Sequence, residues 1–305
     1  MIIIGAGMSG LLCAALNPGS IVYEARPEKE QTHKAVFRCK SDSIGQILGI
    51  EFKKVFVYKS IWFDGKDVEP SPRMAHLYSQ KVSGKILTRS ILDITPCIRY
   101  IAPENFYNIL ESRCAVEYNK YIYRSDFIEK SFGECPVIST IPMPKMMDLL
   151  DMEARVFPSN PIYVNRIKIE KCDTYCTIYY PDPEINAYRA SINGDILIIE
   201  STTPINRKDI YHICDSFGIP FTRQMLNYLL NHFQPLGKIS AIRNSIREKI
   251  ITDMTLKHNV YSLGRFATWR PKVMLDDVLK DISHIRKMIA GGDYAVLKKR
   301  QNERN

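Results

Sequence analysis

Three closely spaced glycines near the start of the chain form its clearest chemical pattern. Gly5, Gly7 and Gly10 follow the apolar run "MIII" and open an apolar segment that is typical of a helix. In a strand–turn–helix unit, the first glycine allows a tight turn, the second lets the backbone approach a pyrophosphate, and the third lets helix and strand pack closely. The helix N-terminus then presents amide donors and a positive dipole end to the phosphates. The spacing therefore predicts a dinucleotide site.

A second predicted strand completes this unit. The segment "IVYEA" contains Glu24, which lies 19 residues after Gly5, where a carboxylate can accept hydrogen bonds from ribose hydroxyls. Between helix and strand, "NPGS" carries residues that end helices. The motif alone permits either NAD or FAD. The predicted cofactor-binding residues of the unit are Gly5, Ala6, Gly7, Met8, Ser9, Gly10, Glu24, Ala25 and Arg26.

The elements that must position this site come from both ends of the chain. A last predicted strand, "NVYSLG", runs into a Gly-Arg turn and then into the amphipathic helix "MLDDVLKDISHIRKMIAGG". A dinucleotide domain built from both ends, with a second domain inserted between them, is a flavoprotein layout that a simple two-half NAD domain would not need. We therefore expect an α/β fold, with a Rossmann-like FAD-binding domain and an inserted α+β substrate domain.

Periodicity and turn signals set the expected boundaries. Residues 51–70 and 162–201 have the pattern of strands, whereas residues 71–115 and 206–232 are predicted to be mostly helical. The FAD-binding domain is predicted to comprise residues 1–50, 105–160 and 235–295, the substrate domain residues 51–104 and 161–234, and the end of the chain, residues 296–305, a basic tail.

Composition limits the class of protein. Of the 305 residues, 45% are hydrophobic and 25% are charged, as in ordinary soluble globular proteins. No apolar run approaches the roughly 18 residues of a membrane span, so no membrane contact is expected. The eight cysteines are scattered and no metal-ligand spacing occurs, which indicates reduced thiols in a cytoplasmic protein and no metal. Oligomeric state cannot be read from these features.

The charge indicates the kind of partner. With 42 Lys and Arg against 33 Asp and Glu, the net charge is +9. A basic surface aids solubility, and it also suits a polyanionic partner such as a nucleotide-like small molecule or a nucleic acid.

Three residues are candidates for work on a substrate: His33, Arg38 and Arg189. A histidine near a redox cofactor can transfer protons, and an arginine can bind an anionic substrate group. Each also has a structural alternative: the histidine as a surface or satisfied core residue, the arginines as surface side chains. No Ser-His-Asp arrangement or phosphate-loop lysine motif is visible, which argues against a hydrolase or a kinase.

Four segments resemble the FAD-dependent amine oxidase superfamily, particularly the branch similar to UDP-galactopyranose mutase and phytoene-desaturase-like oxidoreductases. They are "IIIGAGMSGLLCAA" with "VYEARP", "PVISTIPMPKMMDLL", "TIYYPDPEINAYRASI" and "VYSLGRFATWRPKVMLDDVL". The segments occur in the order that the family has and cover about a fifth of the chain. The resemblance implies FAD as the cofactor.

The fourth segment carries the flavin contacts that the resemblance implies. Gly264 and Arg265 would approach the pyrophosphate or the ribityl chain, and Trp269 would line the flavin pocket or pack in the core. The amides of Met274 and Leu275 would face the pyrimidine edge of the flavin at a helix N-terminus. The two aspartates that follow are expected to favour the helix start.

The chain departs from the family after "EARPE". The family's Gly-Gly pair is missing there, so His33, Lys34 and Arg38 are expected to line the dimethylbenzene side of the flavin instead. The sugar mutase's diphosphate-binding arginines are not found by motif.

Three functions remain open at this point. The first is a FAD-dependent, amine-oxidase-like oxidoreductase that oxidises a C–N or C–C bond by hydride transfer to flavin. Its substrate is expected to be anionic, with an amino-modified nucleotide or a nucleic-acid base as candidates. The second is a non-redox nucleotide-sugar mutase that uses reduced FAD, and the third is a non-catalytic nucleotide- or nucleic-acid-binding protein.

Overall fold

The apolar run at the start of the chain forms the central strand of a parallel sheet. In the computed structural model, which describes residues 1–27, 35–86 and 90–291, β1 (Ile2–Ile4) lies between β2 (Ile21–Tyr23) and β7 (Val137–Ser139). Strands β6 (Ala115–Glu117) and β13 (Val260–Ser262) complete five parallel strands in the order β13-β7-β1-β2-β6. This is a doubly wound sheet of the Rossmann kind.

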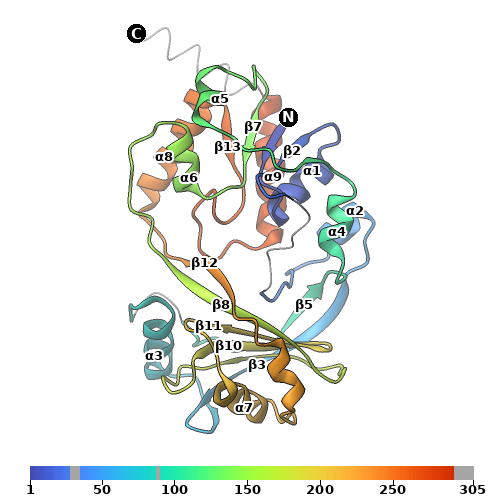
Figure 1. Ribbon diagram of the computed structural model, residues 1–305, viewed down its shortest axis with the longest axis vertical. Helices are drawn as coiled ribbons and strands as arrows, with labels where there is room; N and C mark the ends of the chain where they lie inside the picture. Colours follow the sequence, from blue (N-terminus) through green and yellow to red (C-terminus); the bar gives the residue numbers. More distant parts are fainter. Residues whose placement is uncertain (28–34, 87–89, 292–305) are drawn as a thin grey trace.

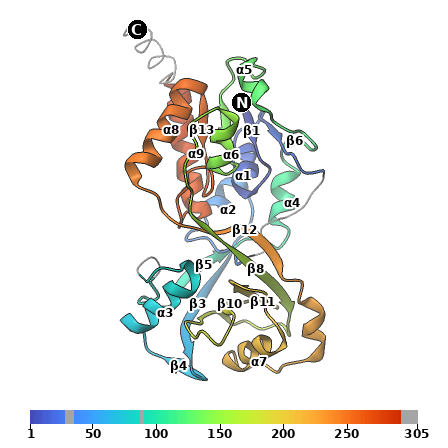
Figure 2. The same ribbon diagram turned by 60° about the vertical axis from the view of Figure 1, so that its left-hand side comes forward.

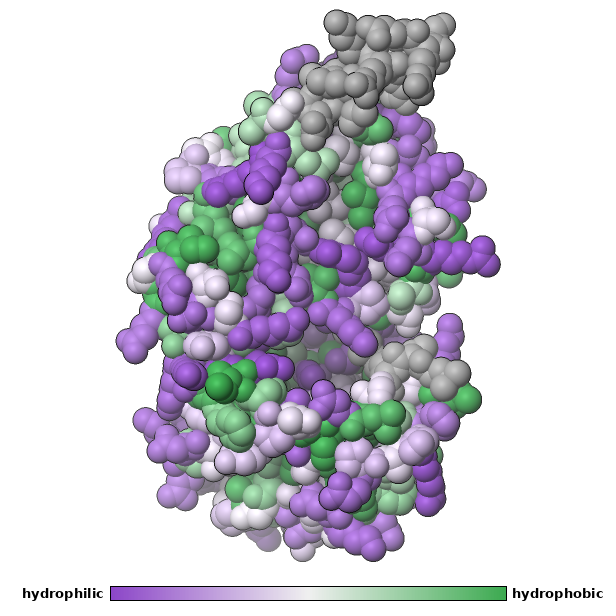
Figure 3. Space-filling view, turned by 180° about the vertical axis from the view of Figure 1, so that it is seen from behind, coloured by the Kyte–Doolittle hydropathy of each residue, from purple (hydrophilic) through white to green (hydrophobic). Residues whose placement is uncertain are grey.

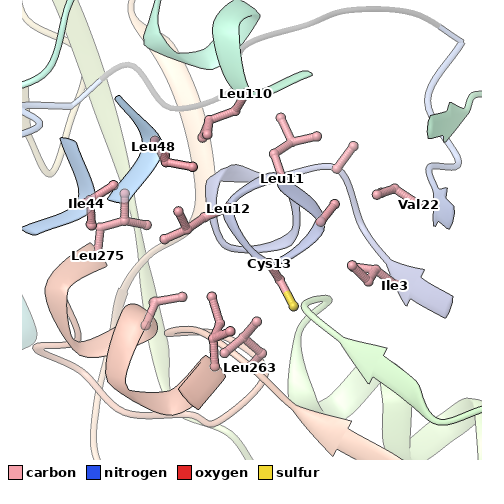
Figure 4. Close-up of a cluster of buried hydrophobic side chains, with 14 of the residues drawn as sticks. Ile3, Leu11, Leu12, Cys13, Val22, Ile44, Leu48, Leu110, Leu263 and Leu275 are labelled. Carbon is pink, nitrogen blue, oxygen red and sulfur yellow. The ribbon is translucent and has the colours of Figure 1, made fainter. Parts of the chain in front are cut away.

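Helices cover both faces of this sheet because successive strand residues point to opposite sides. Ile3 and Ile138 face a cluster that contains α1 (Met8–Leu16) and α9 (Leu275–Ala290), with α2 (Ser43–Leu48) and α4 (Phe106–Glu111) at its margin. Figure 4 shows α1 at the centre of that cluster. Ile4 and Val137 face the opposite cluster, with α6 (Met143–Leu149) and α8 (Asn244–His258). The short α5 (Arg124–Ile128) packs beside α6.

A larger mixed sheet organises the second domain. Its order is β12-β8-β11-β10-β9-β3-β4, with β5 also paired to β3, and all pairs are antiparallel except β3 with β9. Figures 1 and 2 show β8 and β12 running between the two domains. The strands are β3 (Lys53–Phe63), β4 (Lys66–Val68), β5 (Cys97–Ile101), β8 (Ser159–Lys168), β9 (Tyr175–Tyr179), β10 (Ala187–Asn193), β11 (Ile196–Ser201) and β12 (His232–Ile239).

Each face of the second sheet also packs against a helix. Ala190 and Leu197 face α7 (Arg207–Ser216), whose first turn is capped by the Asn206 side chain. The 3-10 helix η1 (Arg223–Tyr228) packs on the same side. Val164 and Ile198 face α3 (Pro72–Ser83), which begins with a Ser cap and Pro at the first helical position. The same face also carries polar side chains of β9, β10 and β11, among them Thr177, Ser191, Arg189 and Glu200, and is called the polar face below.

One prediction of secondary structure is wrong in detail. Residues 71–115 contain the strand β5 as well as α3 and α4, because β5 finds its partner in Lys53–Val57 far back along the chain. Pairing with a distant strand overrides the local pattern there. Residues 206–232 contain the helices α7 and η1, as predicted, and β12 begins at the last residue of that range, His232. The expected α/β class with a parallel sheet and an inserted mixed sheet is what the structure has.

Lys81 holds α3 against the turn between β9 and β10. The side chain is largely buried, and its ammonium group donates to four carbonyl oxygens of that turn, those of Tyr180, Asp182, Ile185 and Ala187. An ammonium group satisfies several carbonyls at once, which no apolar side chain of the same length can do.

We expect Lys81→Met to lower the free energy of unfolding by about 3 kcal/mol, because the carbonyls would stay buried without donors. Urea unfolding measures the change. The matched control is Lys145→Met, since Lys145 is exposed and paired only with Asp148, so a change under about 0.5 kcal/mol is expected. Equal effects of the two substitutions would contradict this role for Lys81.

Candidate functional site

The glycine turn between β1 and α1 (residues 5–10) is built as the spacing predicts. Gly5 has φ +102°, a conformation that side chains rarely adopt. A Cβ on Gly10 would lie 2.0 Å from the carbonyl oxygen of Gly5, so only glycine lets the helix pack this closely on the turn. These two residues therefore serve the shape of the turn.

Gly7 faces open space. A Cβ built on it meets no described heavy atom within 4 Å, and its φ of −74° is an ordinary one. Gly7 is the N-cap of α1, and among the described residues no side chain caps this helix and no acidic residue lies in its first turn. The amide groups of Met8 and Ser9 therefore lie in an uncapped first turn of α1, at the positive end of the helix dipole. This arrangement fits a pyrophosphate.

Glu24 lies beside the turn at the end of β2. One carboxylate oxygen accepts from the amide of Ala6 at 2.8 Å and from the guanidinium of Arg26 at 2.9 Å. The other accepts from the backbone and side chain of Arg26, both at 3.0 Å. Burial acts to raise the pKa of Glu24, but the hydrogen bonds from Arg26 and Ala6 outweigh it and hold that pKa below its ordinary value. Ala25, between the two, is exposed.

Glu24 consequently orients the glycine turn, and it remains the residue that is predicted to bind the ribose. We expect Glu24→Gln to weaken FAD binding by about tenfold or more, because an amide cannot accept from Ala6, Arg26 and a ribose hydroxyl together. Fluorescence titration of the FAD-free protein measures the affinity. Glu117, exposed at the end of the neighbouring strand β6, provides the control Glu117→Gln, which should bind FAD as the wild type does.

The turn after β13 packs on the start of α1. Gly264 has φ +87°, and a Cβ there would lie 2.5 Å from the Ser9 hydroxyl oxygen. Arg265 donates from Nη2 to the carbonyl of Gly237 on β12 at 2.9 Å. Segments more than 250 residues apart in the sequence thus meet at the helix N-terminus, as the predicted FAD contacts at Gly264 and Arg265 require.

Trp269 belongs to the core. Its side chain is 1% exposed, its indole donates to the carbonyl of Ser240 at 3.0 Å, and its ring packs edge-on against Phe157. Of the two roles expected for this residue, the structure places the indole in the core rather than on the wall of a pocket.

The start of α9 docks onto the loop that precedes α2. Met274 is the N-cap, and Asp277 accepts from its amide at 2.9 Å, while Leu275 is buried in the first turn. Asp276 accepts from the amides of Lys40 and Ser41 and from the Ser41 hydroxyl. Asp277 has the helix-start role expected for it, whereas Asp276 also anchors a distant loop.

Two of the three candidate substrate residues come together on the polar face of the second sheet. Arg38 donates to Thr177, Ile192 and Asn193 of β9 and β10, and Arg189, on β10, is near enough to lower its pKa. His33 and Lys34 lie outside the described residues, as does the predicted basic tail.

Sequence reasoning missed Glu200, the charged partner of Arg189, and Lys238, which binds the same carboxylate. Glu200 on β11, which is 1% exposed, accepts from Arg189, from the Tyr188 hydroxyl and from Lys238 on β12 at 3.3 Å. A glutamate within the apolar run "DILIIES" is the signal that could have revealed it, since a buried charge in a strand needs a partner.

A cavity of about 670 Å³ lies beside the start of α9. Residues of both domains line it, including Lys85 after α3, Ile239 at the end of β12, and Val273 just before the N-cap of α9. Its charged lining comprises Lys85, Arg270, Lys272 and Lys280 with Asp277 and Asp281, which leaves an excess of positive charge. Figure 3 shows the molecule hollowed between the two domains, with hydrophilic residues along the upper edge of the hollow and a mixture of hydrophilic and hydrophobic residues below it.

Three expected absences can be compared with the described part of the chain. No helix there is long and apolar enough to cross a membrane. Nowhere in the described ranges do three or more His, Cys, Asp or Glu side chains gather as metal ligands. All eight cysteines are described, and each is free.

The two sheets, their connections and the glycine turn define the class: the chain has the fold of FAD-binding flavoproteins. It is similar to reduced UDP-galactopyranose mutase, with a TM-score of 0.62 at 14% identity over 95% of this chain and 93% of the other. It is also similar to an oxidoreductase from Methanosarcina mazei, with a TM-score of 0.54 at 9% identity over 94% and 99% of the two chains.

A tryptophan halogenase from Shewanella frigidimarina is a third similar structure, with a TM-score of 0.51 at 11% identity over 99% of this chain and 73% of the other. No protein-family model matches the chain, and no curated protein matches it in sequence. The similarity spans a mutase, an oxidoreductase and a halogenase, so it establishes a general flavoprotein fold that is broader than the amine oxidase branch.

Proposed function

We propose that this chain is a FAD-dependent oxidoreductase of the amine-oxidase-like kind that oxidises a C–N or C–C bond of an anionic substrate. The observation that carries the proposal is the open face of Gly7 at an uncapped helix N-terminus, with Glu24 on one side and the Gly264 turn on the other. These residues fit the phosphates and the ribose of a dinucleotide.

Each part of the site has a defined task in this proposal. Glu24 binds the ribose, the amides after Gly7 bind the pyrophosphate, and the start of α9 faces the flavin ring. The amide of Met274 already donates to Asp277, so the Leu275 amide is the one left for the flavin in this proposal. FAD, when bound, supplies the acceptor for a hydride. Glycine at positions 10 and 264 lets the two turns pack closely against Gly5 and Ser9 beside this site.

The substrate side of the proposal rests on charge. The cavity beside α9 and the polar face of the second sheet both carry more cations than carboxylates among the described residues. An amino-modified nucleotide or a nucleic-acid base would suit such a surface, and the net charge of +9 supports an anionic partner. The free cysteines are in keeping with the expected cytoplasmic location.

The absorbance spectrum of the purified protein, supplemented with FAD and desalted, tests the cofactor. We expect a bound flavin spectrum, and bleaching of that spectrum when an oxidisable substrate is added without oxygen. A protein that retains no flavin contradicts the proposal. Nucleic-acid binding that weakens steeply with salt, without flavin uptake, would favour the non-catalytic alternative instead.

A second candidate is a mutase that uses reduced FAD on a nucleotide sugar, because the chain is similar over nearly its full length to UDP-galactopyranose mutase. Anaerobic turnover separates the two candidates. An oxidoreductase consumes one equivalent of oxidised flavin for each substrate, whereas a mutase isomerises its substrate only after dithionite reduction and without net oxidation.

A further inference from the structure

Two cations bind one buried carboxylate on the polar face of the second sheet, and a third cation lies near one of them. Arg189 and Lys238 both bind Glu200, which is 1% exposed. Arg38 reaches the same face from the loop before α2. In this basic cluster (Arg38, Arg189 and Lys238), two cations share Glu200 and the third, Arg38, binds elsewhere on the same face.

Arg38 is bound only to neutral groups among the described residues. Its guanidinium donates to the Thr177 hydroxyl at 3.0 Å, the Ile192 carbonyl at 2.8 Å and the Asn193 amide oxygen at 3.3 Å. Burial, and next the charge of Arg189, lower the pKa of Arg38 to about 10. A buried charge without a counter-charge is unfavourable, so a site that retains one is a candidate for binding an anion.

One N–H donor of Arg189 has no acceptor among the described residues. Its Nη2 binds Glu200, but its Nε is buried and has no acceptor among the described residues. The side chain is nevertheless 28% exposed, so a ligand can reach part of it from solvent. A second oxyanion beside Arg189 would complete its hydrogen bonds and balance the charge of Arg38.

The basic cluster lies close to the expected cofactor site. Lys238 follows Gly237, whose carbonyl accepts from Arg265, and Arg265 follows Gly264, which packs on Ser9 at the start of α1. A substrate group held by the cluster would therefore be connected through β12 to the turn that is expected to contact FAD.

We propose that Arg38 and Arg189, with Lys238 behind them, form a subsite for an oxyanion group of the substrate, a carboxylate or a phosphate. The inference rests on the proposed function for the identity of that substrate, but the subsite itself is defined by the second sheet. Glu200 holds Arg189 and Lys238 in place, and the Arg38 loop closes the subsite from the side of the first domain.

The test uses the protein loaded with FAD, titrated with potassium phosphate or with potassium acetate against potassium chloride at constant ionic strength. The readouts are the melting temperature and the flavin difference spectrum. We expect a saturable rise in melting temperature with one of the two oxyanions, and the stronger of them identifies the group. Arg38→Gln should weaken the apparent affinity at least tenfold, whereas Arg155→Gln, at an exposed arginine paired with Glu153, should not change it.

Arg189→Lys is the second variant, because it retains a charge opposite Glu200 while removing the buried Nε donor. It should weaken the oxyanion response at least threefold, which a purely structural role of Arg189 would not produce. The subsite is disproved if the wild type shows no response beyond chloride, or if both variants respond as the wild type does.

The flavin spectrum of the same samples distinguishes the two proposals. Protein that takes up no FAD, but shows a response dependent on Arg38 and Arg189, would contradict the proposed function and leave the subsite standing. Flavin-loaded protein without that response would contradict the subsite alone.

Discussion

Gly7→Ala is expected to leave the FAD-free protein as stable as the wild type and to weaken FAD binding by about 10- to 100-fold. The added methyl meets no described atom, and φ of −74° suits alanine, so the folded chain has nothing to rearrange. A bound pyrophosphate needs that same space, and overpacking costs about 1–3 kcal/mol. Urea unfolding of the FAD-free protein and fluorescence titration with FAD measure the two quantities.

Gly10→Ala is the matched comparison. Its methyl would lie 2.0 Å from the Gly5 carbonyl oxygen, so helix and turn must separate and the FAD-free protein should lose about 3 kcal/mol of stability. Within the glycine turn, Gly7 is therefore expected to matter for FAD binding and Gly10 for the stability of the fold. Normal FAD affinity in Gly7→Ala would mean that the cofactor does not approach the turn there.

Glu200→Gln is expected to lower the free energy of unfolding by about 3–5 kcal/mol, because it leaves Arg189 and Lys238 without their carboxylate. Chemical denaturation at neutral pH measures the loss. Glu248→Gln is the control, since Glu248 is exposed and paired with Arg247, and it should cost less than about 1 kcal/mol. Similar losses for the two variants would contradict the proposed role of the buried carboxylate.

The same glutamate predicts a pH dependence. Burial acts to raise the pKa of Glu200, but the charges of Arg189 and Lys238 and the hydrogen bonds to it prevail and hold that pKa far below its ordinary value. The unfolded chain therefore binds this proton first, near its reference pKa of about 4.3.

It follows that the stabilisation from Glu200 is fully present above about pH 5 and is lost as the pH falls, by up to about 1.4 kcal/mol per pH unit for one proton. Unfolding curves between pH 6 and about pH 3 measure this loss. Glu200→Gln should show a smaller decrease over this range, and equal slopes in variant and wild type would refute the assignment.

The glycine turn could be predicted because the residues that contact one another in it are close in the sequence. Gly5, Gly10 and the apolar run before them are within ten residues of one another, so sequence spacing fixes which atoms approach. The last strand and helix were likewise predictable from periodicity and from the resemblance. Glu24 was predictable as an acid at the end of a strand, but its bonds to Arg26 and Ala6 were not.

The sequence could not reveal contacts between residues far apart in the chain. Asp276 accepts hydrogen bonds from the amides of Lys40 and Ser41, and Trp269 lies in the core. Both contacts depend on how helices, strands and loops far apart in the chain pack together. The strand β5 was missed for the same reason, because its partner decides its structure.

By itself, the sequence determined the dinucleotide turn, the α/β class and the arrangement of a cofactor domain made from both chain ends. The tertiary structure alone decided that Arg38 and Arg189 share one face of a sheet, and that Glu200 and Lys238 join them. The reason is physical: backbone conformation and helix starts depend on neighbours along the chain, whereas a charge cluster forms only when strand pairing brings distant side chains into one low-dielectric space.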